Sequence, residues 1–325
     1  MTVAILALLI SALLVPPAEA ATTKRSAKPA ATKANRTAKV TPRPRARAAK
    51  VAPQRLRATR VSRVAPAAID EDPTHLEVKS SAALVLDTDG RTLYAKNIES
   101  VQPIASITKL MTAMVVLDAR LDLNEPIAIT EDDIDHLKHT RSRLKIGTVL
   151  TRDELLRLAL MASENRAASA LGRSFPGGLA AFVAAMNRKA ADIGMVRTRF
   201  VDSSGLSSDN VSTAQDLARM VTSAYRYPII QEYTTLTEHV VRTNEGRPLA
   251  FRNSNGLVKD STWHIDVSKT GYIQEAGRCL VMQARIAAKP VIIVLLDSWG
   301  KYTRIGDANR IKRWMESALA QHTPG

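Results

Sequence analysis

The spacing of hydrophobic residues changes twice along the chain, and the changes separate two groups of predicted strands from a helical block. Apolar residues on either side of an Asp-Thr-Asp-Gly turn predict a β-hairpin with strands at 82–86 and 91–95. Apolar residues at helical spacing over 107–117 predict the first helix. Long apolar segments predict consecutive strands toward the C-terminal end, at 263–270, 278–287 and 290–296.

Polar residues mark where the other predicted helices begin. The sequence Thr-Arg-Asp-Glu at 151–154 is a capping box and predicts a helix through about Met161. Further helices are predicted after Asn165, near Leu179, from a capping box at 212–215, and over 307–319 with one apolar face. This order predicts an α+β fold: an antiparallel sheet with flanking helices plus an all-α insertion.

The first 20 residues have the composition of an export signal. Residues 5–15 are apolar apart from Ser11, and Ala-Glu-Ala at 18–20 supplies the small residues of a cleavage site. The apolar run is shorter than the ~20 residues that a membrane-spanning helix needs. We therefore expect residues 1–20 to be a cleaved signal peptide, with an uncleaved N-terminal anchor as the alternative.

Residues 21–69 carry nearly all the excess charge of the protein. They contain 14 Lys and Arg and no Asp or Glu, a composition that predicts a disordered basic linker rich in Ala and Pro. Residues 70–325 hold 32 basic and 30 acidic side chains and form the expected folded domain, so the net charge of +15 belongs mainly to the linker. Behind an export signal, the linker is expected to meet anionic envelope polymers rather than nucleic acid, or to be a solvated tether without a specific partner.

The cysteine and histidine content argues against other chemistries. Cys279 is the one cysteine, so no intramolecular disulfide is possible, and its apolar neighbours predict a thiol buried in a strand. His136 and His139 have a metal-ligand spacing, but the acidic segment around them lacks the H-E-x-x-H pattern and is expected to be a solvated turn. No metal and no cofactor are expected.

One short motif joins a nucleophile to a base. Ser106-Ile107-Thr108-Lys109 opens the first predicted helix, and a spacing of three places the hydroxyl and the amine on one face. A serine hydroxyl needs an adjacent base, and a lysine can supply it if burial lowers the pKa of its amine. The start of a helix also offers backbone N–H groups to a developing oxyanion. Alone, this pattern is common by chance.

Two further motifs supply groups that could handle a peptide. Ser163-Glu164-Asn165 falls between two predicted helices, where a hydroxyl can relay a proton and an amide can hold a carbonyl; an ordinary helix junction is the alternative. Lys269-Thr270-Gly271 ends a predicted strand, whose edge can dock an extended peptide while the ammonium and hydroxyl bind a carboxylate. Glycine lets the backbone approach the ligand, although a polar strand end is the simpler explanation.

Together and in this order, the three motifs resemble the set of penicillin-binding proteins and serine β-lactamases. The flanking segments resemble those of low-molecular-mass D,D-peptidases, above all the D-alanyl-D-alanine endopeptidases, from about Leu84 to Trp314; they lie at 103–113, 160–168, 200–206, 251–255 and 300–303. The resemblance implies a periplasmic catalytic domain at 70–325 that acts on peptidoglycan peptides and binds β-lactams.

The same resemblance implies a role for each motif residue. The catalytic groups would be Ser106 as acylated nucleophile, Lys109 as its base and Ser163 as proton relay. Four residues would bind the substrate: Asn165, Lys269, Thr270 and Gly271. The backbone N–H groups of Ser106 and Tyr272 would form the oxyanion hole.

Three alternatives remain open at this point. A β-lactamase of class A would need a Glu-x-x-Leu-Asn segment between Asn165 and Gln215, and none is present. A non-catalytic wall-binding module would be expected to lack a reactive residue, yet all are present. A D,D-carboxypeptidase is harder to separate from an endopeptidase; the short sequence after the last predicted helix favours the endopeptidase, because carboxypeptidases of this family continue into a β-rich domain.

Overall fold

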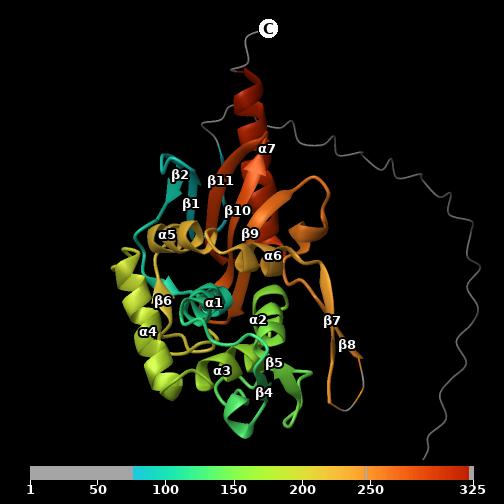
Figure 1. Cartoon of the computed structure of the whole chain (residues 1–325). Coiled ribbons are helices and arrows are strands. Elements are labelled where there is room, and N and C mark those ends of the chain that lie inside the picture. Colours follow the sequence, from blue (N-terminus) through green and yellow to red (C-terminus); the bar gives the residue numbers. More distant parts are fainter. Residues whose placement is uncertain (1–75, 245, 247, 322–325) are drawn as a thin grey trace, which may run out of the picture. The chain divides into compact units, whose positions relative to one another are not determined.

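A five-stranded antiparallel sheet, in the order β2-β1-β11-β10-β9, forms the centre of the computed structural model (Figure 1). The structure describes residues 76–244, 246 and 248–321, so the predicted signal peptide and linker lie outside the described residues. The sheet strands are β1 (Ala82–Asp87), β2 (Thr92–Lys96), β9 (His264–Ile273), β10 (Gly277–Ile286) and β11 (Lys289–Ser298). Because β1 pairs with β11, the sheet joins sequence from both ends of the described chain.

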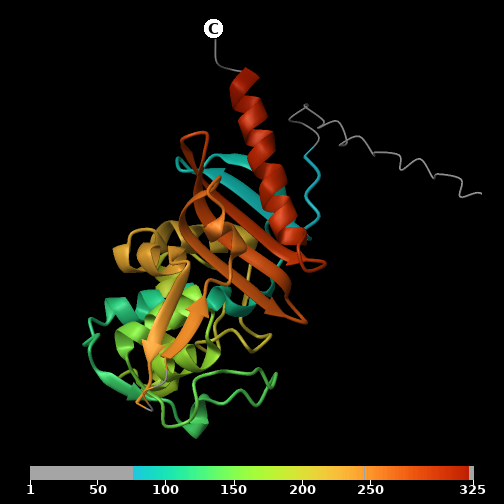
Figure 2. The same cartoon turned by 90° about the vertical axis from the view of Figure 1, so that its right-hand side faces the viewer.

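Helices cover both faces of this sheet (Figures 1 and 2). One face packs against the helical block and the other against α7, so strand residues alternate between two cores. Val281 and Val294 face the block, whereas Leu280 and Ile293 face α7. The helices are η2 (Ala105–Ile107), α1 (Thr108–Asp118), η3 (Glu131–Asp133), α2 (Arg152–Met161), α3 (Asn165–Arg173), α4 (Gly178–Asp192), α5 (Ala214–Ala224), α6 (Pro228–Thr235), η4 (Gly256–Lys259) and α7 (Thr303–Gln321).

Three short antiparallel pairs complete the described fold. They are β3 (Gln102–Pro103) with β6 (Val211–Ser212), β4 (Pro126–Ala128) with β5 (Val149–Thr151), and β7 (Glu238–Arg242) with β8 (Pro248–Arg252). The α+β class, the antiparallel sheet and the helical insertion are therefore confirmed. Helix α6 and the β7–β8 hairpin were not predicted.

Several boundaries differ from the predictions. The Lys-Thr-Gly motif lies inside β9, which continues to Ile273, so it does not end the strand. The second capping box was wrong: Ser212 lies in β6, and the N-cap of α5 is Thr213, whose hydroxyl accepts from the Asp216 amide. Helix α7 begins at Thr303, four residues before the predicted start.

The buried thiol is confirmed, whereas the acidic turn needed correction. Cys279 is fully buried, and burial raises the pKa of its thiol to about 11, which removes it as a nucleophile. His136 and His139 are exposed as expected. The turn around them is not fully solvated, because Asp133 and Asp135 are buried and accept hydrogen bonds or ion pairs from Arg173 and from backbone amides.

No described helix is both long and apolar enough to cross a lipid bilayer. Likewise, the described residues contain no cluster of three or more His, Cys, Asp or Glu arranged to hold a metal ion.

Candidate active site

The hydroxyl of Ser106 and the amine of Lys109 lie in contact where η2 passes into α1. Lys109 Nζ is 2.7 Å from Ser106 Oγ, a contact that the spacing of three residues permits. Ile104, Ile107 and Leu110 around them are fully buried in the core beneath the helical block. This apolar packing draws the turn into the protein and leaves the Lys109 side chain with no exposed surface.

Lys109 is surrounded by three hydrogen-bond acceptors. Besides Ser106 Oγ, its Nζ lies 2.8 Å from Asn165 Oδ1 and 2.6 Å from the Ser204 carbonyl oxygen. A neutral amine has two N–H bonds and one lone pair, so it can donate to Asn165 and Ser204 and accept the Ser106 proton. Burial lowers the pKa of Lys109 to about 7, and the carboxylates of Asp202 and Glu164 only partly oppose that effect. The amine can therefore serve as a base near neutral pH.

A second buried lysine lies beside Ser163. Lys269 Nζ donates to Ser163 Oγ at 2.8 Å and to the carbonyl of Thr270 at 3.0 Å. Burial, followed by repulsion from Lys109 and Arg304, holds the pKa of Lys269 well below its ordinary value. Ser163 has a left-handed backbone, with φ of 60°, which places its hydroxyl between the end of α2 and the start of α3.

The middle and last residues of the Ser-Glu-Asn motif have different structural tasks. Glu164 is the N-cap of α3 and accepts from the amide of Arg166. Asn165 accepts from Lys109 and donates through Nδ2 to Thr140 Oγ1 at 3.0 Å. Thr140 thus takes one of the two N–H bonds of the Asn165 amide. Nothing in the sequence singled out Thr140.

Strand β9 presses its glycine against the nucleophile. A Cβ atom at Gly271 would lie 2.9 Å from the Ile104 carbonyl oxygen and 3.1 Å from the Ser106 amide nitrogen. Any other residue would push the strand away from Ser106. Beside it, Thr270 Oγ1 donates to Ser254 Oγ at 2.8 Å, so two hydroxyls adjoin the strand edge.

Arg304 orients the peptide unit that joins Gly271 to Tyr272. Its Nη1 donates to the Gly271 carbonyl oxygen at 3.1 Å. In a trans peptide the C=O and the following N–H point in opposite directions, and the described chain has no cis peptide bonds. Arg304 on the carbonyl side therefore directs the Tyr272 N–H toward the opposite side. Arg304 was not predicted as a site residue, because it lies at the start of α7, outside the three motifs and just after the resembling segment at 300–303.

The loop at 202–210 packs against η2 and contacts the side chain of Lys109. Asp202 accepts from the amides of Ser204 and Ser207 at 2.7 and 2.8 Å, which curls the loop and points the Ser204 carbonyl at Lys109. Gly205 has φ of +79°, and a Cβ atom there would lie 2.0 Å from the Ala105 carbonyl oxygen. This segment was noticed in the sequence only as a resemblance, without a role for its residues.

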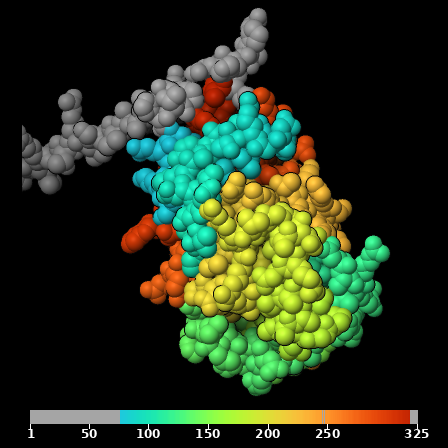
Figure 3. Space-filling model, turned by 90° about the vertical axis from the view of Figure 1, so that its left-hand side faces the viewer, coloured from blue at the N-terminus to red at the C-terminus, as the bar shows by residue number. Residues whose placement is uncertain are grey.

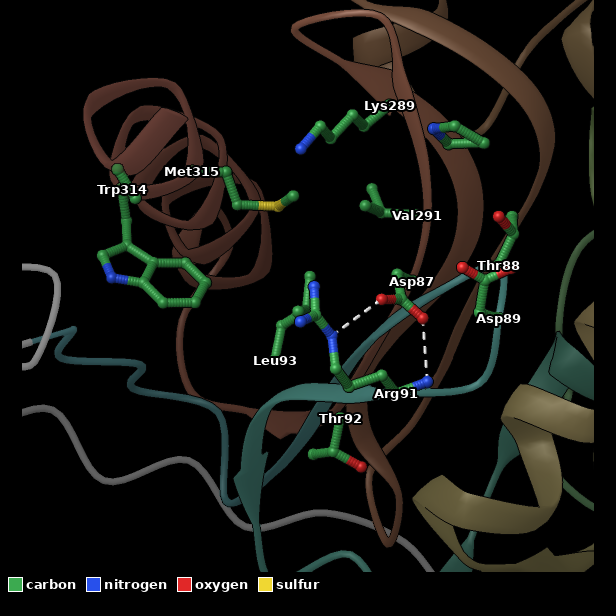
Figure 4. Close-up of a pocket in the computed structure, with 12 residues that line it drawn as sticks. Asp87, Thr88, Asp89, Arg91, Thr92, Leu93, Lys289, Val291, Trp314 and Met315 are labelled. Atoms are coloured by element: carbon green, nitrogen blue, oxygen red, sulfur yellow. Dashed lines mark hydrogen bonds and ion pairs between the residues drawn. The ribbon is translucent and has the colours of Figure 1, made fainter. Parts of the chain in front are cut away.

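The structure thus brings all the predicted site residues to one place, the junction of η2, β9 and the α2–α3 turn. A separate hollow of about 600 Å³ lies between the β1–β2 turn, Lys289 and α7 (Figure 4). Lys289 pairs with Ile286 at one end of β10, whereas Tyr272 pairs with Arg278 at the other, so the hollow lies roughly 25 Å from the site along the strand. It contributes no group to the chemistry described above.

Comparison with known proteins shows similarity to D-alanyl-D-alanine peptidases. A family model described as D-alanyl-D-alanine carboxypeptidase matches residues 67–300. The chain is 46% identical over 254 residues to a D-alanyl-D-alanine endopeptidase of Pseudomonas aeruginosa, covering 78% of this chain and 82% of that protein. It is 43% identical over 250 residues to a D-alanyl-D-alanine endopeptidase of Escherichia coli, covering 76% and 81%.

Solved structures agree on the fold. The DD-transpeptidase of Streptomyces K15 superposes with a TM-score of 0.68 at 27% identity, covering 73% of this chain and 97% of that one. A D-alanyl-D-alanine carboxypeptidase of Mycobacterium tuberculosis gives a TM-score of 0.66 at 26% identity, covering 74% and 91%.

Proposed function

This chain belongs to the D-alanyl-D-alanine carboxypeptidase family of serine peptidases, and on that premise we propose that it hydrolyses D-Ala-to-diaminoacid crosslinks of peptidoglycan through an acyl-enzyme on Ser106. The observation that carries the proposal is the contact of 2.7 Å between Ser106 Oγ and the buried amine of Lys109. A lysine with a pKa of about 7 is half neutral at neutral pH, so the nucleophile and its base coexist in one site.

Acylation follows from the positions of these groups. Ser106 Oγ transfers its proton to neutral Lys109 and attacks the D-Ala carbonyl carbon, and the carbonyl oxygen becomes an oxyanion. The N–H groups of Ser106 and Tyr272 stabilise that oxyanion, with Arg304 holding the Tyr272 peptide in place. The C–N bond then breaks, and the leaving amine receives the proton through Ser163. A water molecule attacks the resulting ester and restores Ser106.

Asn165 and strand β9 hold the peptide during these steps. An extended peptide can pair with the edge of β9, the outermost strand of the sheet. Lys269, Thr270 and the adjoining Ser254 hydroxyl form a polar segment within β9 that suits a carboxylate. A β-lactam presents a carbonyl and a carboxylate in the same relation, so it would acylate Ser106 as the peptide does.

We favour the endopeptidase over the carboxypeptidase because the two relatives described above, 46% and 43% identical to this chain, are named endopeptidases. In a crosslink, the diaminoacid beside the scissile bond carries its own α-carboxylate, which Lys269, Thr270 and Ser254 can bind. The test is kcat/KM on crosslinked muropeptide dimer and on monomeric pentapeptide at one pH and salt concentration. We expect the dimer to be the better substrate; faster release of free D-Ala from pentapeptide would make the protein a carboxypeptidase.

The remaining parts of the chain complete the proposal. Residues 1–20 would direct export to the periplasm, and residues 70–325 would form the catalytic domain. The basic linker at 21–69 would bring that domain to anionic envelope polymers through its 14 positive charges.

A further inference from the structure

The exposed aromatic side chains of the described chain gather beside the proposed active site. Within residues 76–244, 246 and 248–321, the exposed aromatic residues are Tyr272, Trp299 and Tyr302, with relative exposures of 56%, 82% and 70%. The other described aromatic residues are buried or half-buried. Exposed apolar surface that gathers in one place on a soluble domain usually marks an interaction site.

Sheet register brings these residues together. Tyr272 on β9 lies opposite Arg278 on β10, and Arg278 lies opposite Ser298 on β11. Adjacent strands are about 4.8 Å apart, so the Cα atoms of Tyr272 and Ser298 are separated by roughly 10 Å. Trp299 follows Ser298 directly, and Tyr302 lies three residues further along, in the connection to α7. Figures 2 and 3 show the end of β9 and this connection projecting from the same side of the molecule.

Cations accompany the aromatic rings. The Arg278 guanidinium lies 4.4 Å from the centre of the Tyr272 ring, and Lys301 Nζ lies 5.3 Å from that of Tyr302. Glu275, in the turn after β9, forms an ion pair with Lys138. The surface therefore combines flat apolar area with positive charge.

The connection that carries Trp299 and Tyr302 is anchored at both ends. Ser298 Oγ hydrogen-bonds Ser80 Oγ at 2.7 Å, and the buried Asp307 accepts from the Ser80 amide at 2.8 Å. Between them, Arg304 donates to the Gly271 carbonyl beside Ser106. The aromatic surface thus keeps a constant position relative to the proposed oxyanion hole.

We infer that Tyr272, Arg278, Trp299, Lys301 and Tyr302 form a surface that binds the glycan-peptide strand carrying the scissile crosslink. A sugar ring would stack its apolar C–H face on Trp299, and stem-peptide carboxylates would pair with Arg278 and Lys301. The inference rests on the proposed function. A wall strand fits better than a lipid surface, because Tyr272 directly follows Gly271 and a strand held at the site therefore continues onto this surface.

The experiment compares one substrate with and without its sugars. The double variant Trp299→Ala/Tyr302→Ala is assayed on a crosslinked muropeptide dimer that bears its disaccharides, and on the same dimer after enzymatic removal of the sugars. Val196→Ala is the matched control, because Val196 is 83% exposed and lies next to α4, away from this surface. Acylation by fluorescent penicillin reports whether the catalytic groups are intact.

We expect kcat/KM of the double variant to fall about tenfold on the sugar-bearing dimer and to stay within about twofold on the sugar-free dimer, with unchanged acylation. Equal losses on both dimers, or no loss on either, would overturn the inference. So would binding of wild type but not the double variant to anionic phospholipid vesicles, with unchanged hydrolysis of both dimers. If wild type hydrolyses neither dimer but is acylated by penicillin, the proposed endopeptidase function fails instead.

Discussion

The amine of Lys109 is buried, and burial disfavours its charged form. This is the central electrostatic feature of the site. The Lys109 side chain has no exposed surface, and burial lowers the pKa of its amine to about 7. An ordinary lysine, with a pKa near 10.5, would be almost wholly protonated at neutral pH. Burial therefore converts a common surface residue into a base for Ser106.

The first prediction concerns the nucleophile. Penicillin is expected to form one covalent adduct, at Ser106, because this hydroxyl lies 2.7 Å from Lys109 Nζ in the proposed site. Intact mass measurement and peptide mapping of wild type and Ser106→Ala check the site of attachment. Ser163→Ala serves as a comparison that keeps the nucleophile, and an adduct on any residue other than Ser106 would contradict the assignment.

The second prediction concerns the base. Lys109→Ala should slow acylation by at least ~10²-fold, because a general base acts in the transition state, while non-covalent binding of substrate changes much less. Lys109→Arg is the sharper variant, since a guanidinium keeps the charge but does not release its proton at accessible pH. Stopped-flow acylation separates the two steps. Near-normal acylation in the arginine variant would assign the proton transfer to another group.

The third prediction follows from the direction of the pKa shift. Lys109 must be neutral to accept a proton, so the rate of acylation should rise as pH increases and level off above its pKa of about 7. Without the shift, the rise would continue toward pH 10. A pH series of penicillin acylation between about pH 5 and 9 checks this, and a rate that falls across that range would exclude Lys109 as the base.

At the scale of elements, the turn that carries Ser106 is held between two glycines. Gly205 of the loop at 202–210 and Gly271 of β9 both approach the backbone around Ala105 and Ser106 within distances that exclude a Cβ atom. The loop keeps its shape because Asp202 accepts several backbone amides. Three segments distant in sequence thus define the position of one hydroxyl.

The fourth prediction tests that contact. Gly205→Ala should lower acylation strongly, because its Cβ would lie 2.0 Å from the Ala105 carbonyl oxygen and displace η2. Gly90→Ala is the matched control: Gly90 has a similar φ, +83°, but nothing lies within 4 Å of its Cβ position. Both variants bear the same backbone strain, so a difference in acylation between them, at comparable melting temperature, measures the steric effect. Equal acylation rates would contradict it.

At the scale of the whole molecule, charge is divided unevenly between residues 21–69, which we propose to be a linker, and residues 70–325, the proposed catalytic domain. Residues 21–69 hold 14 positive charges, whereas residues 70–325 carry a net charge of only +2. A concentrated positive segment attracts anionic polymers over about 10 Å at 0.1 M salt. Catalysis and attachment to the wall are therefore expected to depend on different parts of the chain.

The fifth prediction separates those parts. Deletion of residues 21–69 should leave kcat/KM on small muropeptides unchanged but weaken binding to insoluble sacculi, and the difference should disappear as salt rises. Pull-down of both proteins with sacculi across a salt titration checks this. Equal binding at every salt concentration would reduce the linker to a spacer.

Local patterns in the sequence were enough for much of the fold. The Asp-Gly hairpin, the capping box at Thr151 and the apolar runs of β9 to β11 depend on residues within a few positions of one another, so short-range preferences decide them. The α+β order followed from them. The motif residues could be found for a similar reason, because each motif is a short run whose chemistry requires particular side chains.

Other features arise only when distant segments pack together. Thr140 contacts Asn165, Arg304 contacts Gly271, and the Ser204 carbonyl contacts Lys109, over separations of 25, 33 and 95 residues. No local pattern encodes such pairs, since they depend on how the sheet and helices assemble. The lowered pKa of Lys109 is also a tertiary property, because desolvation depends on the atoms that surround the amine. Sequence alone indicated the candidate reactive groups, because each lies in a short motif, whereas packing decided their protonation, their orientation and the surface beside them.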